Sequence, residues 1–135
     1  MKVALIDYGA GNLRSVANAL RALGQEPAVV ADAAELGDAT HLLLPGVGSF
    51  GDCMAQLEQR GLANLIRSWV SAGRPYLGIC LGYQILFDSS DESPGVAGLG
   101  LFRGKVKRFG DVPGVKIPHM GWNAARPAKP NLKNW

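Results

Sequence analysis

Four short apolar runs, with helical periodicity in the segments between them, restrict the fold of this chain more than any other feature. The runs lie at residues 3–6, 27–30, 42–44 and 76–79. Apolar residues recur at helical spacing from Leu13 to Leu23 and from Met54 to Val70, with a break at Gly61. Uninterrupted apolar runs are typical of strands buried on both faces. Alternating strands and helices predict an open α/β sheet, mostly parallel, with helices on both faces.

The pattern changes in the last third of the chain. A helix is predicted from Tyr83 onward, ending near the turn-rich loop at 88–95, and short strands are predicted at 105–109 and 115–117. The segment from residue 125 to 135 follows neither period and reads as a loop cut off partway. We therefore expect residues 1–135 to form the N-terminal portion of one domain whose remainder is missing.

Composition favours a soluble globular protein, with 47% hydrophobic and 19% charged residues. No apolar run approaches the roughly 18 residues of a membrane helix, and the first residues do not resemble a signal peptide. The two cysteines, Cys53 and Cys80, make no disulfide framework. A reducing compartment, and so a cytoplasmic location, is the expectation.

The formal net charge of +3 is unevenly distributed. Residues 101–135 contain eight lysines and arginines and one acid, while the first 100 residues contain six basic and ten acidic residues. A basic tail is compatible with nucleic acid or phosphorylated partners. It has no aromatic pattern of an RNA-binding surface beside it, so we favour a tail whose acidic complement lies elsewhere.

Cys80 lies at the centre of a Gly-x-Cys-x-Gly sequence, between the apolar run at 76–79 and the helix predicted from Tyr83. This is the cysteine form of the nucleophile elbow, a sharp strand-to-helix turn. Gly78 and Gly82 allow the neighbouring backbone to approach closely. The start of a helix behind the sulfur favours the thiolate, which is the nucleophilic form. The alternative is a small buried core residue, and the two glycines favour the nucleophile.

Two glycine-rich loops follow strands. Gly9-Ala10-Gly11 has the position of a dinucleotide fingerprint, but Arg14 stands where the third glycine belongs. The loop at 45–52 has phosphate-loop spacing with Asp52 in place of the lysine, and a carboxylate there repels phosphate. A better role for this second loop is a backbone donor: the N–H of Val47 joins that of Leu81 in an oxyanion hole. A simple glycine turn is the alternative.

A cysteine nucleophile requires a general base, usually a histidine. The chain contains only His41 and His119. His41 begins the third predicted strand, at the edge of the sheet opposite Cys80. His119 is more simply interpreted as a surface or packing residue. The chemistry predicted from the residues alone is therefore incomplete.

The sequence from Pro75 to Gln84 resembles the elbow of the class I, triad-type glutamine amidotransferases. Three further stretches, at 7–13, 44–48 and 118–123, resemble those of one branch, the glutaminase subunits of imidazole glycerol phosphate synthases. The resemblance extends from Met1 to about Asn123. It implies the flavodoxin-like amidotransferase fold with its C-terminal part missing.

The resemblance also implies roles for individual residues. Cys80 attacks the side-chain amide of glutamine and forms a glutamyl thioester, and ammonia passes to a (βα)8-barrel partner in histidine biosynthesis. No cofactor or metal is implied. Glutamine is held by Gly46, Gly48 and Gln84. The residues implied to face the partner are Asn12, Met120 and Trp122.

One departure from the family is large. The family's triad histidine and glutamate lie in a His-Pro-Glu segment near the C-terminus, and this sequence contains no such segment. We therefore expect the chain alone to have little or no glutaminase turnover. The competing hypothesis is a non-enzymatic redox sensor with an exposed thiol, and a nucleotide-binding module ranks third.

Overall fold

A parallel sheet forms the centre of the computed structural model, which describes residues 1–110, 113–114, 116–118, 121–124 and 126. Its strands are β1 (Val3–Ile6), β2 (Ala28–Val30), β3 (His41–Gly46) and β4 (Tyr76–Cys80), in the order β2-β1-β3-β4. Every neighbouring pair is parallel. The predicted α/β sheet is thus confirmed. The strand order reverses between β1 and β3, and such a switch point is where open α/β sheets bind ligands.

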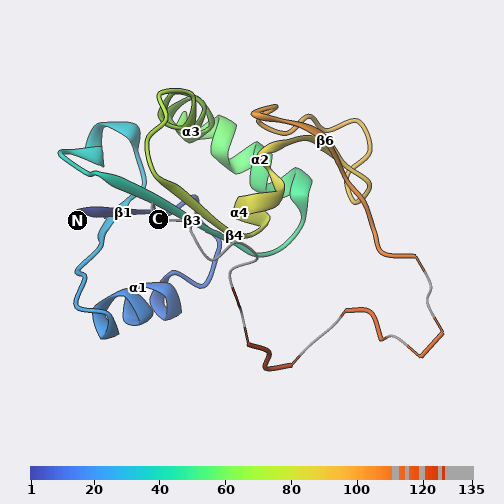
Figure 1. The fold of residues 1–135 in the computed structure, drawn as a ribbon. Helices are drawn as coiled ribbons and strands as arrows, with labels where there is room; N and C mark the ends of the chain where they lie inside the picture. The colour runs from blue at the N-terminus through green and yellow to red at the C-terminus, as the bar shows by residue number, and fades with distance from the viewer. Residues whose placement is uncertain (111–112, 115, 119–120, 125, 127–135) are drawn as a thin grey trace.

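Helices cover both faces of the sheet, as predicted (Figure 1). Helix α1 (Leu13–Ala22) lies on one face, and α2 (Phe50–Gln59) and α3 (Leu62–Ser71) lie on the other. The short 3-10 helix η1 (Ala33–Leu36) leads into β3. Gly61, with a left-handed φ of 69°, separates α2 from α3 at the predicted break.

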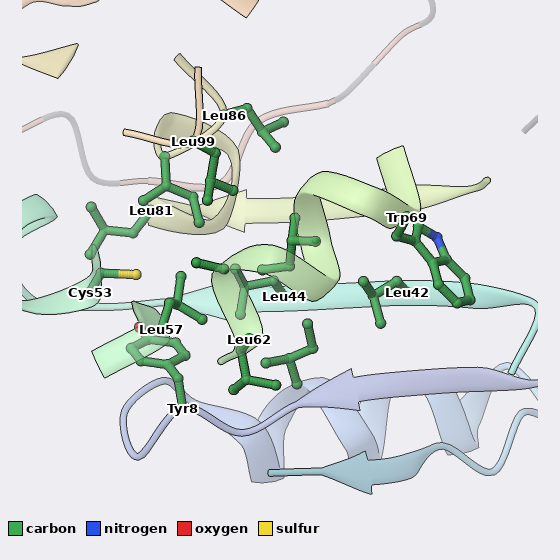
Figure 2. Packing of buried hydrophobic residues seen from close by; sticks show 14 of the residues in the cluster. Tyr8, Leu42, Leu44, Cys53, Leu57, Leu62, Trp69, Leu81, Leu86 and Leu99 are labelled. Atoms are coloured by element: carbon green, nitrogen blue, oxygen red, sulfur yellow. The ribbon is translucent and has the colours of Figure 1, made fainter. Parts of the chain in front are cut away.

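The core is divided by the sheet because successive strand residues point to opposite faces. Val3 and Leu5 of β1 pack beneath α1, while Ala4 and Ile6 belong to the larger cluster under α2 and α3. Figure 2 shows part of this larger cluster, in which Tyr8 and Cys53 lie among leucines. The face under α1 is less complete, and the prediction that the run at 76–79 is buried on both faces is wrong: no residue of β4 is fully buried, and Leu77 and Ile79 are 48% and 40% exposed.

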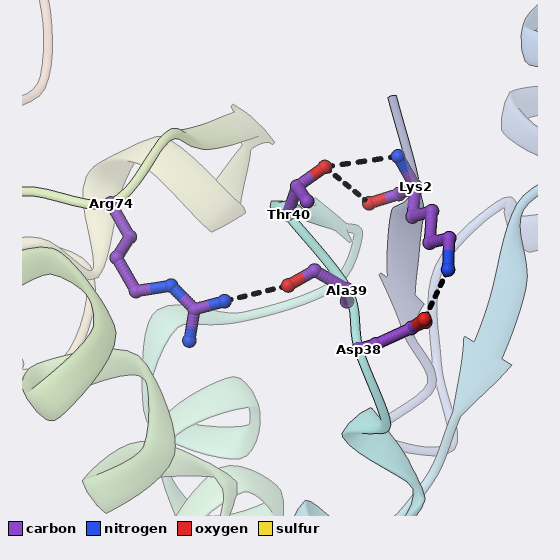
Figure 3. A network of polar contacts seen from close by, with 5 residues as sticks. All are labelled: Lys2, Asp38, Ala39, Thr40 and Arg74. Atoms are coloured by element: carbon purple, nitrogen blue, oxygen red, sulfur yellow. Dashed lines mark hydrogen bonds and ion pairs between the residues drawn. The ribbon is translucent and has the colours of Figure 1, made fainter.

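Polar contacts tie together the N-terminal ends of the strands (Figure 3). The Lys2 amide donates to the Thr40 hydroxyl at 2.9 Å, and the Thr40 hydroxyl donates to the Lys2 carbonyl at 3.2 Å. The Arg74 guanidinium donates to the Ala39 carbonyl at 2.6 Å and lies 3.2 Å over the Trp69 ring. Lys2 also pairs with Asp38. These contacts fix the strand ends remote from Cys80.

The helix after the elbow differs from the prediction. Helix α4 (Leu81–Gln84) begins directly after Cys80, makes one turn and ends before the predicted limit near residue 88. The carbonyls of Ile85 and Leu86, which a longer helix needs as acceptors, instead accept the amides of Leu99 and of Leu101 and Phe102 respectively. These contacts with a distant segment end the helix.

A small second sheet occupies the place of that predicted helix and loop. Strand β5 (Phe87–Ser90) pairs in parallel with β6 (Phe102–Val106). The strand predicted at 105–109 is therefore wrong in its bounds. Of the strand predicted at 115–117, Lys116 and Ile117 are not in a strand, and Val115 lies outside the described residues. No helix in the described part of the chain is long and apolar enough to span a membrane.

Candidate active site at the C-terminal ends of β3 and β4

Cys80 sits on a sharp backbone turn between β4 and α4. Its φ of 56° and ψ of −114° make it the one non-glycine residue with a positive φ in the described part of the chain. A side chain held in this region costs about 1–3 kcal/mol, and such strain clusters at functional sites. The thiol is exposed. The predicted elbow is thus present, and its sulfur is accessible.

Glycines are required at this elbow because the backbone of β3, β4 and α4 converges there. A Cβ added at Gly46 would lie 2.5 Å from the Leu81 Cβ and 2.8 Å from the Gly82 amide nitrogen. A Cβ at Gly78 would overlap the Gly82 carbonyl oxygen, and one at Gly82 would overlap the Leu44 carbonyl oxygen. The Gly-x-Cys-x-Gly spacing therefore reflects close backbone packing rather than flexibility.

A buried hydroxyl supports the elbow from within the fold. Tyr76, at the start of β4, donates its hydroxyl to the Gly82 carbonyl at 2.6 Å. Burial raises the pKa of the Tyr76 hydroxyl well above its usual range, so it remains a donor. The contact joins the two ends of the elbow and holds α4 against β4.

Residues 46–48 form the turn that carries the predicted oxyanion-hole donor, Val47, and are called the oxyanion turn below. This turn lies beside the elbow, because Gly46 at the end of β3 pairs in register with Cys80. Val47 follows Gly46 and is 51% exposed. Its amide N–H donates to the Tyr8 hydroxyl oxygen at 3.2 Å, and the same hydroxyl lies 3.4 Å from the Val47 carbonyl oxygen as a donor. The Leu81 amide is the first of α4, a position without an acceptor inside its helix.

Sequence reasoning missed Tyr8. It follows β1 as Val47 follows β3, so the two residues meet at the switch point of the sheet. The usable signal is a lone tyrosine at the carboxyl end of a buried strand, next to a glycine-rich loop.

The two thiols have different surroundings. Cys53, on α2, is 1% exposed, and burial raises the pKa of its thiol to about 11. Burial, reinforced by the neighbouring Cys53 thiol, raises the pKa of the Tyr8 hydroxyl to about 12. Both groups are therefore protonated at neutral pH, and exposed Cys80 is the thiol available to a substrate.

A cavity of about 460 Å³, lined mostly by residues with polar or charged side chains, adjoins the end of α4. It is lined by Gln84, Ser90, Asp91, Glu92, Val106, Lys107 and Arg108, and Cys80 is not among these residues. Gln84 is the one predicted substrate-binding residue in this lining. Carboxylates and cationic side chains around one cavity suit a ligand that carries both charges, such as a free amino acid.

The remaining predicted residues lie elsewhere. His41 starts β3, at the opposite end of the strand from Gly46, with its Nδ1 2.8 Å from the Thr40 hydroxyl. Asn12 and Trp122 are exposed. His119 and Met120 lie outside the described residues. No group of His, Cys, Asp and Glu in the described ranges has the arrangement of a metal site.

Fold and elbow together define a class of protein, and the family comparison agrees. Residues 4–131 match the family described as glutamine amidotransferase class-I, and the chain belongs to that family. The particular branch is indicated by close relatives. The imidazole glycerol phosphate synthase subunit HisH of Methanothermobacter thermautotrophicus is 53% identical over 121 residues, 90% of this chain and 59% of that protein.

Further relatives and solved structures agree with this family. HisH of Geobacillus kaustophilus is 52% identical over 96% of this chain and 63% of its own length. The chain thus spans about three fifths of the length of these relatives. A crystal structure of a glutamine amidotransferase has a TM-score of 0.68 and 25% identity, over 80% of this chain and 57% of its own. PurLQS from Thermotoga maritima has a TM-score of 0.53 and 30% identity, over 63% of this chain and 42% of its own.

Proposed function

We propose that this chain is the nucleophile-bearing part of the glutaminase subunit of an imidazole glycerol phosphate synthase, acting in histidine biosynthesis. The observation that carries the proposal is the exposed Cys80 on its left-handed turn, in register with Gly46 of the oxyanion turn. Relatives named as that synthase subunit, at about half identity, support the assignment of the branch.

In the proposed reaction the Cys80 thiolate adds to the side-chain amide carbon of glutamine. The carbonyl oxygen takes the negative charge and accepts hydrogen bonds from the amides of Leu81 and Val47. The C–N bond then breaks, the nitrogen takes a proton and leaves as ammonia, and the glutamyl thioester is hydrolysed by water to glutamate.

Glutamine is proposed to be held by the turn at 46–48 and by the cavity. Gly46 and Gly48 would place backbone beside the amide end of the substrate, and Gln84, at the end of α4, lines the charged cavity. In that cavity, Glu92 and Lys107 suit the α-ammonium and α-carboxylate groups respectively. Glu92 also accepts the Phe50 amide at 2.8 Å, which fixes the carboxylate in place.

The proton transfers require a base that the described residues near Cys80 do not provide. We propose that it belongs to a His-Pro-Glu segment of the kind found in the family, which this sequence does not contain. We also propose that a (βα)8-barrel partner receives the ammonia, that Asn12, Met120 and Trp122 face it, and that the enzyme is cytoplasmic.

Two measurements test the proposal. Alkylation of Cys80 by iodoacetamide is expected to be slowed by glutamine and not by asparagine, and Gln84→Ala is expected to remove this protection. Ammonia release from glutamine is expected to stay at background for the chain alone. An alkylation rate that glutamine does not change contradicts the proposed site. Ammonia release by the Cys80→Ala variant contradicts it as well. Turnover by the isolated chain that depends on Cys80 contradicts the need for a further base.

The redox-sensor alternative receives no support from the comparisons. Its signature is a stable sulfenic or sulfinic acid on Cys80 after peroxide treatment, formed at a rate that glutamine does not change.

A further inference from the structure

The Tyr8 hydroxyl contacts both polar backbone atoms of one residue, Val47. It accepts the Val47 amide N–H at 3.2 Å and lies 3.4 Å from the Val47 carbonyl oxygen. The amide belongs to the peptide that precedes Val47 and the carbonyl to the peptide that follows it. One hydroxyl therefore fixes the orientation of both peptide planes of the proposed oxyanion turn.

The hydroxyl is held firmly by its surroundings. Tyr8 is 1% exposed and belongs to the large core cluster under α2 and α3 (Figure 2). Its hydroxyl is also near the buried Cys53 thiol, which contributes to the raised pKa of Tyr8. A ring packed in this way does not turn aside without opening a cavity. Movement that breaks the Tyr8–Val47 contact must therefore occur on the exposed side, in the turn.

The turn has the freedom for such movement. Val47 is half exposed, and Gly48 after it has a φ of 94° with no atom within 4 Å of an added Cβ. Gly46, by contrast, is packed against Leu81 and Gly82. The peptides around Val47 are thus anchored at Gly46, restrained by Tyr8 and free at Gly48.

We propose that Tyr8 is a positioning residue that keeps the Val47 amide occupied in the resting protein, so that this amide reaches an oxyanion only after the Tyr8–Val47 hydrogen bond breaks. The proposal rests on the proposed function in one respect, the role of Val47 as an oxyanion donor. An N–H that already donates to a phenol oxygen is a poor donor to a second acceptor in another direction. Tyr8 therefore restrains the reaction instead of promoting it.

Tyr8→Phe tests the proposal, with Tyr83→Phe on α4 as the control that removes a tyrosine hydroxyl elsewhere near the elbow. Tyr83 is 54% exposed. The probe is the chloromethyl ketone analogue of glutamine. In this reaction the Cys80 thiolate first adds to the ketone carbon, which places the negative charge on the ketone oxygen. The sulfur then transfers to the chloromethyl carbon, the carbonyl re-forms, the C–Cl bond breaks and chloride leaves. Iodoacetamide alkylates the same thiol by direct displacement and serves as the reference.

The expected result is a change in the ratio of the two rates. Tyr8→Phe should raise the rate with the chloroketone relative to iodoacetamide by roughly twofold to tenfold, the factor that corresponds to one neutral hydrogen bond. Tyr83→Phe should leave the ratio unchanged. An unchanged or lower ratio in Tyr8→Phe overturns the proposal. A change in both rates by one factor indicates general loosening and overturns it equally.

Amide hydrogen exchange of Val47, followed by NMR, tests the contact without any glutamine chemistry. Tyr8→Phe should accelerate exchange of the Val47 amide while the buried Leu44 amide stays protected. Equal Val47 exchange in both proteins overturns the proposal whatever the chloroketone does. If Tyr8→Phe accelerates Val47 exchange but glutamine does not slow the labelling of Cys80 in the wild-type protein, the proposed function is overturned, and with it the catalytic part of this inference.

Discussion

Replacing Cys80 by glycine and, separately, by alanine measures the strain stored at the elbow. Both substitutions remove the thiol, and only glycine adopts a positive φ without steric cost. The backbone at Cys80, with φ 56° and ψ −114°, lies in the region where other residues are strained. Relief of that strain is worth about 1–3 kcal/mol, and the extra chain entropy of glycine costs about 0.5–1 kcal/mol.

The Cys80→Gly protein should therefore be the more stable of the two, by about 1 kcal/mol and by no more than about 2.5 kcal/mol. In ordinary helices and strands this stability difference has the opposite sign, because alanine is there more stable than glycine. Urea unfolding measures it as a shift of the midpoint at constant slope.

A second pair of variants supplies the control. Ser68 lies on the exposed face of α3, where glycine should be less stable than alanine by about 1 kcal/mol. Glycine less stable than alanine at both positions would refute the strained elbow, and with it the structural reason for assigning Cys80 as a nucleophile.

Three further predictions concern the packing around the elbow. Tyr76→Phe leaves the Gly82 carbonyl without its hydroxyl partner and should lower the free energy of unfolding by about 1–3 kcal/mol. The control Tyr83→Phe, at an exposed position, should change it by less than about 0.5 kcal/mol. Equal effects of the two substitutions contradict the support role of Tyr76. Gly82→Ala places a Cβ against the Leu44 carbonyl and should cost about 1–3 kcal/mol in urea unfolding, while Gly110→Ala, with open space around it, should be neutral. Burial raises the pKa of Cys53 from 9.0 to about 11, so between these values the unfolded chain loses a proton that the folded chain keeps, and stability should fall as the pH rises. Cys53→Ala should remove that part of the fall in stability. An unchanged dependence of stability on pH contradicts the raised pKa of Cys53.

The sheet and the elbow could be predicted because their signals are local. Each strand of the sheet is an apolar run, and the break at Gly61 is marked by a glycine that adopts a left-handed φ. Gly78 and Gly82 flank Cys80 because the backbone there is too close for a Cβ. Such features depend on a few neighbouring residues, so they can be predicted from a single sequence.

The rest depends on contacts between distant segments. The single turn of α4 could not be foreseen because the carbonyls of Ile85 and Leu86 accept amides from residues 99–102. Tyr8 and Val47 are 39 residues apart, and only the strand order brings them together. His41 begins β3, at the end of the strand opposite Gly46, as its place at the start of the apolar run predicted.

Mass spectrometry of the chain after treatment with the chloromethyl ketone analogue of glutamine tests the central claim most directly. We predict one adduct, on Cys80, that forms more slowly when glutamine is present, with Cys53 unmodified in the folded protein. An adduct that forms on Cys53 as readily as on Cys80, or one on Cys80 whose rate glutamine does not change, contradicts the account.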